Sequence, residues 1–131
     1  MKRRTTLSLG VCIALSGCLA GINEPQKQID WIRLVNNRSE ASTIDVRIEE
    51  DGEEIFADEY ELGTTPESST ICVEPALTRK SAYALRFRAD GQWVHIYPDE
   101  YADVSEECLG VHFELHQQGT REFDIQPGRD C

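Results

Sequence analysis

Two segments of alternating apolar and polar residues, each turned back on itself at an Asp-Gly pair, constrain the fold of this chain most. The pairs are Asp51-Gly52 and Asp90-Gly91. The segments that flank them are residues 43–50, 53–60, 81–89 and 92–97. A two-residue Asp-Gly loop favours a type I′ turn, because both central residues need a positive φ. The pattern therefore predicts two β-hairpins.

The register of these hairpins can be checked, because a hairpin is favoured when its apolar faces coincide. The predicted cross-strand pairs are Ile48–Ile55, Val46–Ala57, Phe87–Val94 and Leu85–Ile96. Both members of each pair are apolar, so the predicted faces match. We expect the two pairs of the second hairpin, together with Tyr83, to lie in the core.

Other short segments rich in Val, Ile, Tyr and Phe bring the number of predicted strands to about eight. They are residues 29–36, 69–73, 108–116 and 121–125, of which the first is apolar on both faces. Many short strands separated by Gly, Pro, Asn and Asp are typical of a sandwich or barrel. We expect an all-β fold, an immunoglobulin-like antiparallel β-sandwich of seven to eight strands.

The last predicted hairpin admits two registers. A two-residue loop at Gly119-Thr120 sets Cys108 opposite Cys131, but it puts the apolar residues of the two strands on opposite faces. A three-residue loop pairs Leu115 with Phe123 and restores the faces, but it leaves the cysteines one residue out of step. A bulge near the C-terminus would correct that.

The chain begins with the residue order of a cleavable export signal. Basic residues at positions 2–4 and a short apolar run at 7–15 precede Cys18. The run is about half of the roughly 20 residues that a membrane-spanning helix needs. We therefore expect three parts, a signal peptide at residues 1–17, a lipid-anchored tether at 18–28 and the β-sandwich domain at 29–131.

The segment Leu15-Ser16-Gly17-Cys18 resembles the lipobox of prokaryotic lipoproteins, and Arg3-Arg4 resembles a twin-arginine export signal. The lipobox implies cleavage before Cys18 and a lipid on its sulfur. The protein would then lie at the extracellular face of the cell membrane, held by that lipid. An ordinary soluble export signal is the alternative, and the export route stays open.

Acidic residues dominate the part of the chain after the signal. It carries 24 Asp and Glu against ten Lys and Arg, a formal charge of −14, which would repel nucleic acid. In the whole chain Arg outnumbers Lys ten to three. With the lipobox, this composition resembles the exported lipoproteins of haloarchaea, which implies a halophilic surface. An acidic exported protein of a mesophile is the alternative.

The cysteines suggest a disulfide, because an exported protein can form one. Cys12 leaves with the signal and Cys18 would be lipidated, so three thiols remain. We expect a Cys108–Cys131 bridge that pins the last strand, with Cys72 as a small buried hydrophobic residue. A bridge from Cys72 to Cys108 or to Cys131 is the competing connectivity.

The outer face of the second hairpin is the candidate ligand-binding site. If the core residues of that hairpin point inward, Trp93, His95 and Tyr97 point outward beside Arg86 and Arg88. Aromatic residues beside arginines can stack on a sugar or on the surface of a partner protein. On so acidic a chain, this is the place where an anionic partner can approach. Alternatively, these aromatic residues support the sheet as cross-strand pairs.

Metal binding and catalysis have less support. Cys108, His112 and His116 superficially resemble the copper ligands of cupredoxins. Successive members would lie about 13 Å apart along a strand, so one ion cannot reach all three. We expect no metal, no cofactor and no enzymatic activity, because no catalytic motif is present. The expected function is a cell-surface binding or structural module for a glycan or protein. A cupredoxin-like electron-transfer domain is the alternative.

Overall fold

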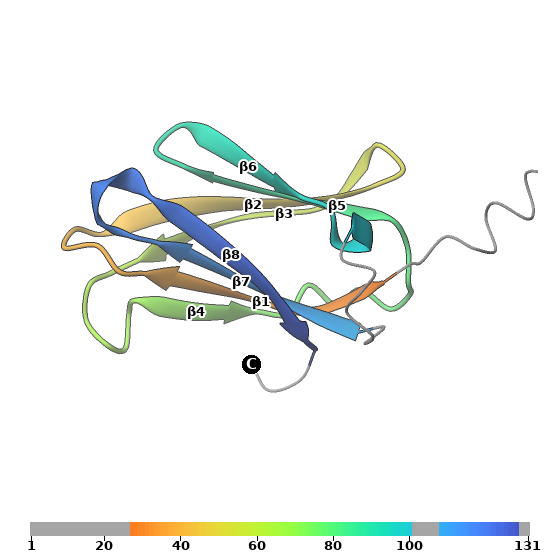
Figure 1. Ribbon diagram of the computed structural model, residues 1–131, viewed down its shortest axis with the longest axis horizontal. Helices are drawn as coiled ribbons and strands as arrows, with labels where there is room; N and C mark the ends of the chain where they lie inside the picture. Colours follow the sequence, from red (N-terminus) through yellow and green to blue (C-terminus); the bar gives the residue numbers. More distant parts are fainter. Residues whose placement is uncertain (1–26, 101–107, 129–131) are drawn as a thin grey trace, which may run out of the picture.

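Two four-stranded β-sheets packed face to face form the described part of the protein (Figure 1). The structure is a computed structural model that describes residues 27–100 and 108–128. The elements in this part are β1 (Gln28–Asn36), β2 (Ser42–Glu50), β3 (Glu53–Leu62), β4 (Thr70–Val73), β5 (Tyr83–Ala89), β6 (Gln92–Ile96), the 3-10 helix η1 (Pro98–Glu100), β7 (Cys108–Leu115), the 3-10 helix η2 (Gln117–Gly119) and β8 (Arg121–Pro127). The expected all-β sandwich of about eight strands is confirmed.

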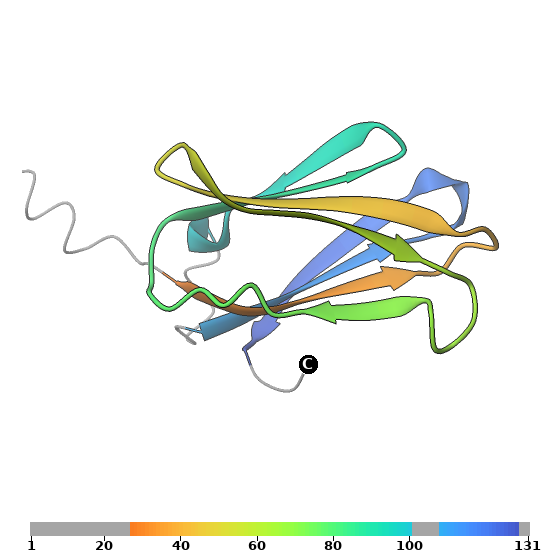
Figure 2. The same cartoon turned by 180° about the vertical axis from the view of Figure 1, so that it is seen from behind.

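The first sheet has the strand order β4-β1-β7-β8, and the second has the order β3-β2-β5-β6. Figure 2 shows the two layers from behind. Within the described strands, β1 and β7 run parallel and the other paired strands run antiparallel. β1 and β2 lie in different sheets, whereas the first two strands of a constant-type immunoglobulin domain share one. The chain therefore changes sheet directly after its first strand.

The second hairpin has the predicted register. Leu85 pairs with Ile96 and Phe87 with Val94. Its turn residue Asp90 has a φ of 56°, and the following glycine is also in the left-handed region, as a type I′ turn requires. This hairpin places β6 at the edge of the second sheet.

The register predicted for the first hairpin is wrong by one residue. A bulge follows Ile48, so that Ile48 pairs with Phe56 and Val46 with Asp58. Ile55 is consequently 39% exposed. The shift turns Phe56 and Tyr60 toward the core, against which both pack. Burial of these two large rings in place of smaller side chains gives the physical reason for the bulge.

The last hairpin adopts neither of the two predicted registers. Phe113 pairs with Phe123, and Val111 pairs with Ile125, so the apolar faces do coincide. The loop is longer than predicted, because η2 inserts a turn that His116 N closes by donating to Thr120 O at 2.8 Å. This five-residue loop matches the apolar faces, as the three-residue loop also would, and it sets Gly128 opposite Cys108.

The main hydrophobic core lies between the two sheets. Phe87 of β5 stacks on Phe113 of β7, with ring centroids 4.6 Å apart and an angle of 8° between the planes. The predicted core residues Leu85, Phe87, Ile96 and Tyr83 are all buried, and Val94 is partly buried against them. Among the described residues there is no helix long and apolar enough to cross a membrane.

The outer face of the first sheet has its own buried aromatic residue. Trp31 is 2% exposed, and its ring lies over Gly110 of β7, the residue that pairs with it. A Cβ atom at Gly110 would lie 2.0 Å from Cζ2 of this ring. β1 is therefore covered on its outer face at Trp31, whereas Arg33 and Val35 farther along that face are only partly buried.

The described fold includes residues before the predicted domain boundary at residue 29. Lys27 is buried and forms a β-bridge with Ser81. The predicted signal peptide and Cys18 lie outside the described residues.

Candidate functional site

A cluster of one indole ring and three guanidinium groups lies on the outer face of the second sheet. Trp93 of β6 pairs with Arg88 of β5, and His95 pairs with Arg86. The guanidinium carbons of Arg86, Arg88 and Arg47 lie 4.7, 4.8 and 5.6 Å from the centroid of the Trp93 ring. We call these five residues the Trp93 face.

Each arginine of the Trp93 face also pairs with a carboxylate. These pairs are Arg86 with Glu49, Arg88 Nη2 with Asp45 Oδ2 at 2.7 Å, and Arg47 Nη1 with Glu54 Oε1 at 3.1 Å. The hydrogen bond to Glu54 raises the pKa of the Arg47 guanidinium above its ordinary value. Because every guanidinium is paired, the face is charge-balanced rather than cationic. The face therefore has no excess positive charge that would attract the anionic partner expected from the sequence.

Two shallow hollows extend the surface at either end of β5. One has a volume of about 350 Å³ and is lined by Tyr97, Glu49 and Ala84 among others. The second has a volume of about 360 Å³ and is lined by charged residues, among them Asp45 and Arg88. Tyr97 is 43% exposed, so its ring is available to a partner.

The structure thus brings the sequence-predicted site residues Trp93, His95, Arg86 and Arg88 onto adjacent strands, with Tyr97 in a hollow beside them. The sequence reasoning missed Arg47 and the carboxylates of β2 and β3. No local signal could have found them, since β2 and β5 are paired across a long sequence separation.

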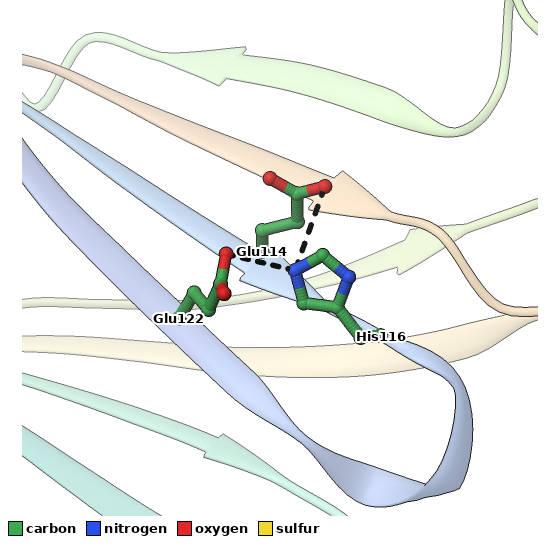
Figure 3. Close-up of side chains that lie close together, drawn as sticks. All are labelled: Glu114, His116 and Glu122. Atoms are coloured by element: carbon green, nitrogen blue, oxygen red, sulfur yellow. Dashed lines mark hydrogen bonds and ion pairs between the residues drawn. The ribbon is translucent and has the colours of Figure 1, made fainter.

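A second cluster lies on the outer face of the first sheet, at the end of β7 and the start of β8 (Figure 3). His116 Nε2 lies 3.0 Å from Glu122 Oε1 and 3.7 Å from Glu114 Oε2. One side-chain ligand atom from each of these residues lies within 4.8 Å of the other two. We call Glu114, His116 and Glu122 the His116 cluster.

Alternation along β7 produces this cluster. Val111, Phe113 and Leu115 are fully buried in the core, so the residues between them face outward. His112 is one of these, and its Nε2 lies 3.0 Å from Glu114 Oε1. Asn37 Nδ2 donates to the other oxygen of Glu114. Two neighbours therefore hold the Glu114 carboxylate in place.

His112 and His116 do not join Cys108, as their spacing predicts. Cys108 begins β7, whereas His116 follows its last residue. The sequence prediction did not group Glu122, which comes from the next strand, with the histidines. The available signal was the alternation of His112, Glu114 and His116, whose side chains point to one face.

The predicted Cys108–Cys131 bridge is wrong, because Cys108 carries a free thiol. The register sets Gly128 opposite Cys108, with Gly128 N donating to Cys108 O at 2.8 Å, and Cys131 lies outside the described residues. Burial, with a smaller effect of Asp30, raises the pKa of the Cys108 thiol above its ordinary value.

Cys72 is exposed and disulfide-bonded, so its predicted role as a small buried hydrophobic residue is also wrong. Its position opposite Arg33 turns it away from the core. Because Cys108 is free, a Cys72–Cys108 bridge is excluded. A Cys72–Cys131 bridge stays a prediction.

Comparison with known proteins adds no family to this description. No family model and no curated protein matches the chain.

Proposed function

We propose that this protein is an exported, lipid-anchored, non-enzymatic module that binds another protein at the cell surface through the Trp93 face. The observation that carries the proposal is the position of Trp93, held by three guanidinium groups on an outer sheet face. Trp, Tyr and Arg are the residue types that contribute most to protein–protein binding energy. Here they lie together with Tyr97 nearby.

The salt bridges support a binding role because they restrict the arginines before a partner arrives. Side chains that are already held lose less conformational entropy on binding. Asp45 accepts from Arg88 at 2.7 Å and lies 3.4 Å from Arg47, so one carboxylate positions two guanidinium groups. Most protein surfaces carry charges of both signs. A charge-balanced surface of this kind favours such a partner over an acidic glycan.

The proposed location depends on the N-terminal sequence. Cleavage before Cys18 and lipidation of its sulfur would attach the domain to the extracellular face of the membrane through a short segment that ends at Lys27. Mass spectrometry of the membrane-extracted protein tests this part separately. We expect a mass that lacks residues 1–17 and includes a lipid, and an unmodified Cys18 would contradict the anchor.

Site-specific photo-crosslinking in the producing cells tests the binding face. A photoreactive benzoylphenylalanine replaces either His95, on the Trp93 face, or Thr70, which is exposed on β4 of the other sheet. We expect a discrete protein adduct from position 95 and none from position 70. An adduct to carbohydrate would show that the ligand is a glycan, and equal products from both positions would refute a specific face.

A matched pair of variants links the adduct to the arginine–indole contacts. Arg88→Ala removes a guanidinium from over Trp93, and Arg33→Ala removes one from 4.7 Å over Trp31 on the opposite outer face. We expect Arg88→Ala to abolish the adduct from position 95 and Arg33→Ala to leave it unchanged. Loss of the adduct in both variants would indicate a general effect on the fold.

A further inference from the structure

We propose that Glu114, His116 and Glu122 bind one divalent transition-metal ion of the zinc type. The three residues come from adjacent positions of the β7–β8 hairpin, and their ligand atoms lie within 4.8 Å of one another. Zinc is bound at about 2.0–2.2 Å by His nitrogen and carboxylate oxygen, often by three protein ligands with a water molecule as the fourth. Small rotations of the two glutamate side chains would bring their oxygens to that distance from an ion on His116 Nε2.

The pairing of the strands indicates that a cation belongs here. Glu114 pairs directly with Glu122 across β7 and β8. Like charges at directly opposite positions destabilise a sheet. His116 Nε2 lies beside both carboxylates, at 3.0 and 3.7 Å, and is thus the atom at which a bound ion would neutralise the two (Figure 3).

The partners of these carboxylates differ from those on the opposite outer face. On that face, arginine guanidinium groups form salt bridges with Asp45, Glu49 and Glu54. An arginine stays protonated in proteins and offers no lone pair to a metal. Glu114 and Glu122 lie instead beside His116, and histidine is itself a common metal ligand. The carboxylates on one face are therefore paired with groups that cannot bind a metal, and those on the other face lie beside a group that can.

Neighbouring groups hold two of the three ligands in position. Asn37 and His112 each contact one oxygen of Glu114. His116 is restrained through its backbone, because its carbonyl accepts from Arg38 Nε at 3.1 Å. Hydrogen bonds to ligating groups fix their orientation and raise metal affinity. Glu122 is 67% exposed, so an ion can enter from solvent on its side.

The donor set selects the class of ion. Calcium and magnesium prefer oxygen ligands throughout, whereas imidazole suits zinc, copper and nickel. One imidazole with two carboxylates is a borderline set of nitrogen and oxygen. Zinc is the suitable probe, because it binds without redox chemistry.

Isothermal titration of the full mature protein with zinc chloride tests the proposal. We expect one ion per chain and no displacement by excess calcium or magnesium. Cys108→Ser is the background for the variants below, so that the free Cys108 thiol cannot contribute to their zinc binding. Wild-type and Cys108→Ser proteins should bind zinc equally.

Four further variants locate the ion. His116→Ala should abolish saturable binding, and Glu122→Gln, which keeps the side-chain shape, should weaken it at least about tenfold. His112→Ala should weaken it by about tenfold, the effect of removing an orienting neighbour. His95→Ala, a histidine on the opposite face, should leave it unchanged.

Two outcomes would overturn the site. Binding that survives His116→Ala would place the ion elsewhere, and zinc binding that calcium displaces would indicate a general acidic surface. Far-ultraviolet circular dichroism of each variant without metal shows whether lost binding reflects lost structure. These outcomes do not depend on the Trp93 face, which lies on the other sheet.

Discussion

Substitution of Gly110 by alanine should destabilise the protein through Trp31. The added methyl group would lie 2.0, 2.1 and 2.5 Å from three atoms of the indole ring. These contacts are far inside van der Waals distance, and the ring is rigid. Since Trp31 is 2% exposed against the outer face of β7, it can relieve the overlap only by leaving its position.

The magnitude follows from the surface that the indole would expose. A buried aromatic side chain covers about 150–250 Å², worth about 4–6 kcal/mol at 25 cal/mol per Å². Loss of the Arg33 contact, at 4.7 Å from the ring centroid, adds about 0.5–1 kcal/mol. Two terms oppose this loss. Trp31 Nε1 is buried without a hydrogen-bond partner, and its hydration returns about 1–3 kcal/mol. Alanine is also favoured over glycine within a strand, by about 0.5–1 kcal/mol.

The expected net loss in the free energy of unfolding is therefore about 2–4 kcal/mol. Urea denaturation followed by far-ultraviolet circular dichroism measures it. A double-mutant cycle with Trp31→Val isolates the cause, because valine keeps strand propensity and removes the ring that the methyl group overlaps. In that background Gly110→Ala should cost less than about 0.5 kcal/mol. An equal cost in both backgrounds would refute the steric reasoning.

Four further predictions follow from the packing and the charges. Phe113→Ala should lower the free energy of unfolding by about 3–5 kcal/mol, because it empties a fully buried position between the sheets; a loss below about 1 kcal/mol in urea denaturation would contradict that packing. Arg38 holds the pKa of Asp90 below its ordinary value, so the charged Asp90 adds stability that is complete above the unfolded pKa of about 4 and is lost as the pH falls through the folded value. The stability difference between wild type and Asp90→Asn, measured at low salt, should accordingly disappear in acid, and a constant difference would exclude this ion pair as its source. In native protein without reductant, Cys108 should react with iodoacetamide, slowly and faster at higher pH, because its pKa is raised; peptide mapping that finds it unmodified at alkaline pH would contradict the free thiol. The urea midpoint should rise toward molar salt if the acidic surface is halophilic, because salt screens the repulsion among its carboxylates, and a fall would favour the mesophilic alternative.

Local chemistry was sufficient to predict the strands and one complete hairpin. Asp90-Gly91 is a two-residue turn, and the residues on either side alternate without interruption, so only one register buries the apolar face. The first hairpin has the same turn, yet its register shifts at Ile48. Whether Ile55 or Phe56 points into the core depends on the space available there, and a local sequence pattern does not contain that information.

The Trp93 face likewise combines residues that local alternation predicts with residues that only the tertiary structure brings there. Alternation alone predicted that Trp93 and His95 share a face with Arg86 and Arg88, because these residues belong to one hairpin. The carboxylates that neutralise the arginines come from β2 and β3, and their positions depend on the pairing of β2 with β5. For that reason an anionic partner was expected at a face whose arginines are in fact all paired with carboxylates.

The residues by themselves determined the all-β class, the two Asp-Gly turns and the outward direction of His112 and His116, because each depends on neighbours within a few positions. Only the tertiary structure decided that Glu122 meets Glu114 and His116 and that Gly128, rather than Cys131, lies opposite Cys108. Both outcomes depend on the length of one loop, because each residue added to it shifts the pairing of β7 with β8. Apolar packing between the two sheets excludes the registers that turn β8 over, but a three-residue and a five-residue loop both keep its faces matched. The choice between these two loops depends on contacts across the whole fold, which no local pattern contains.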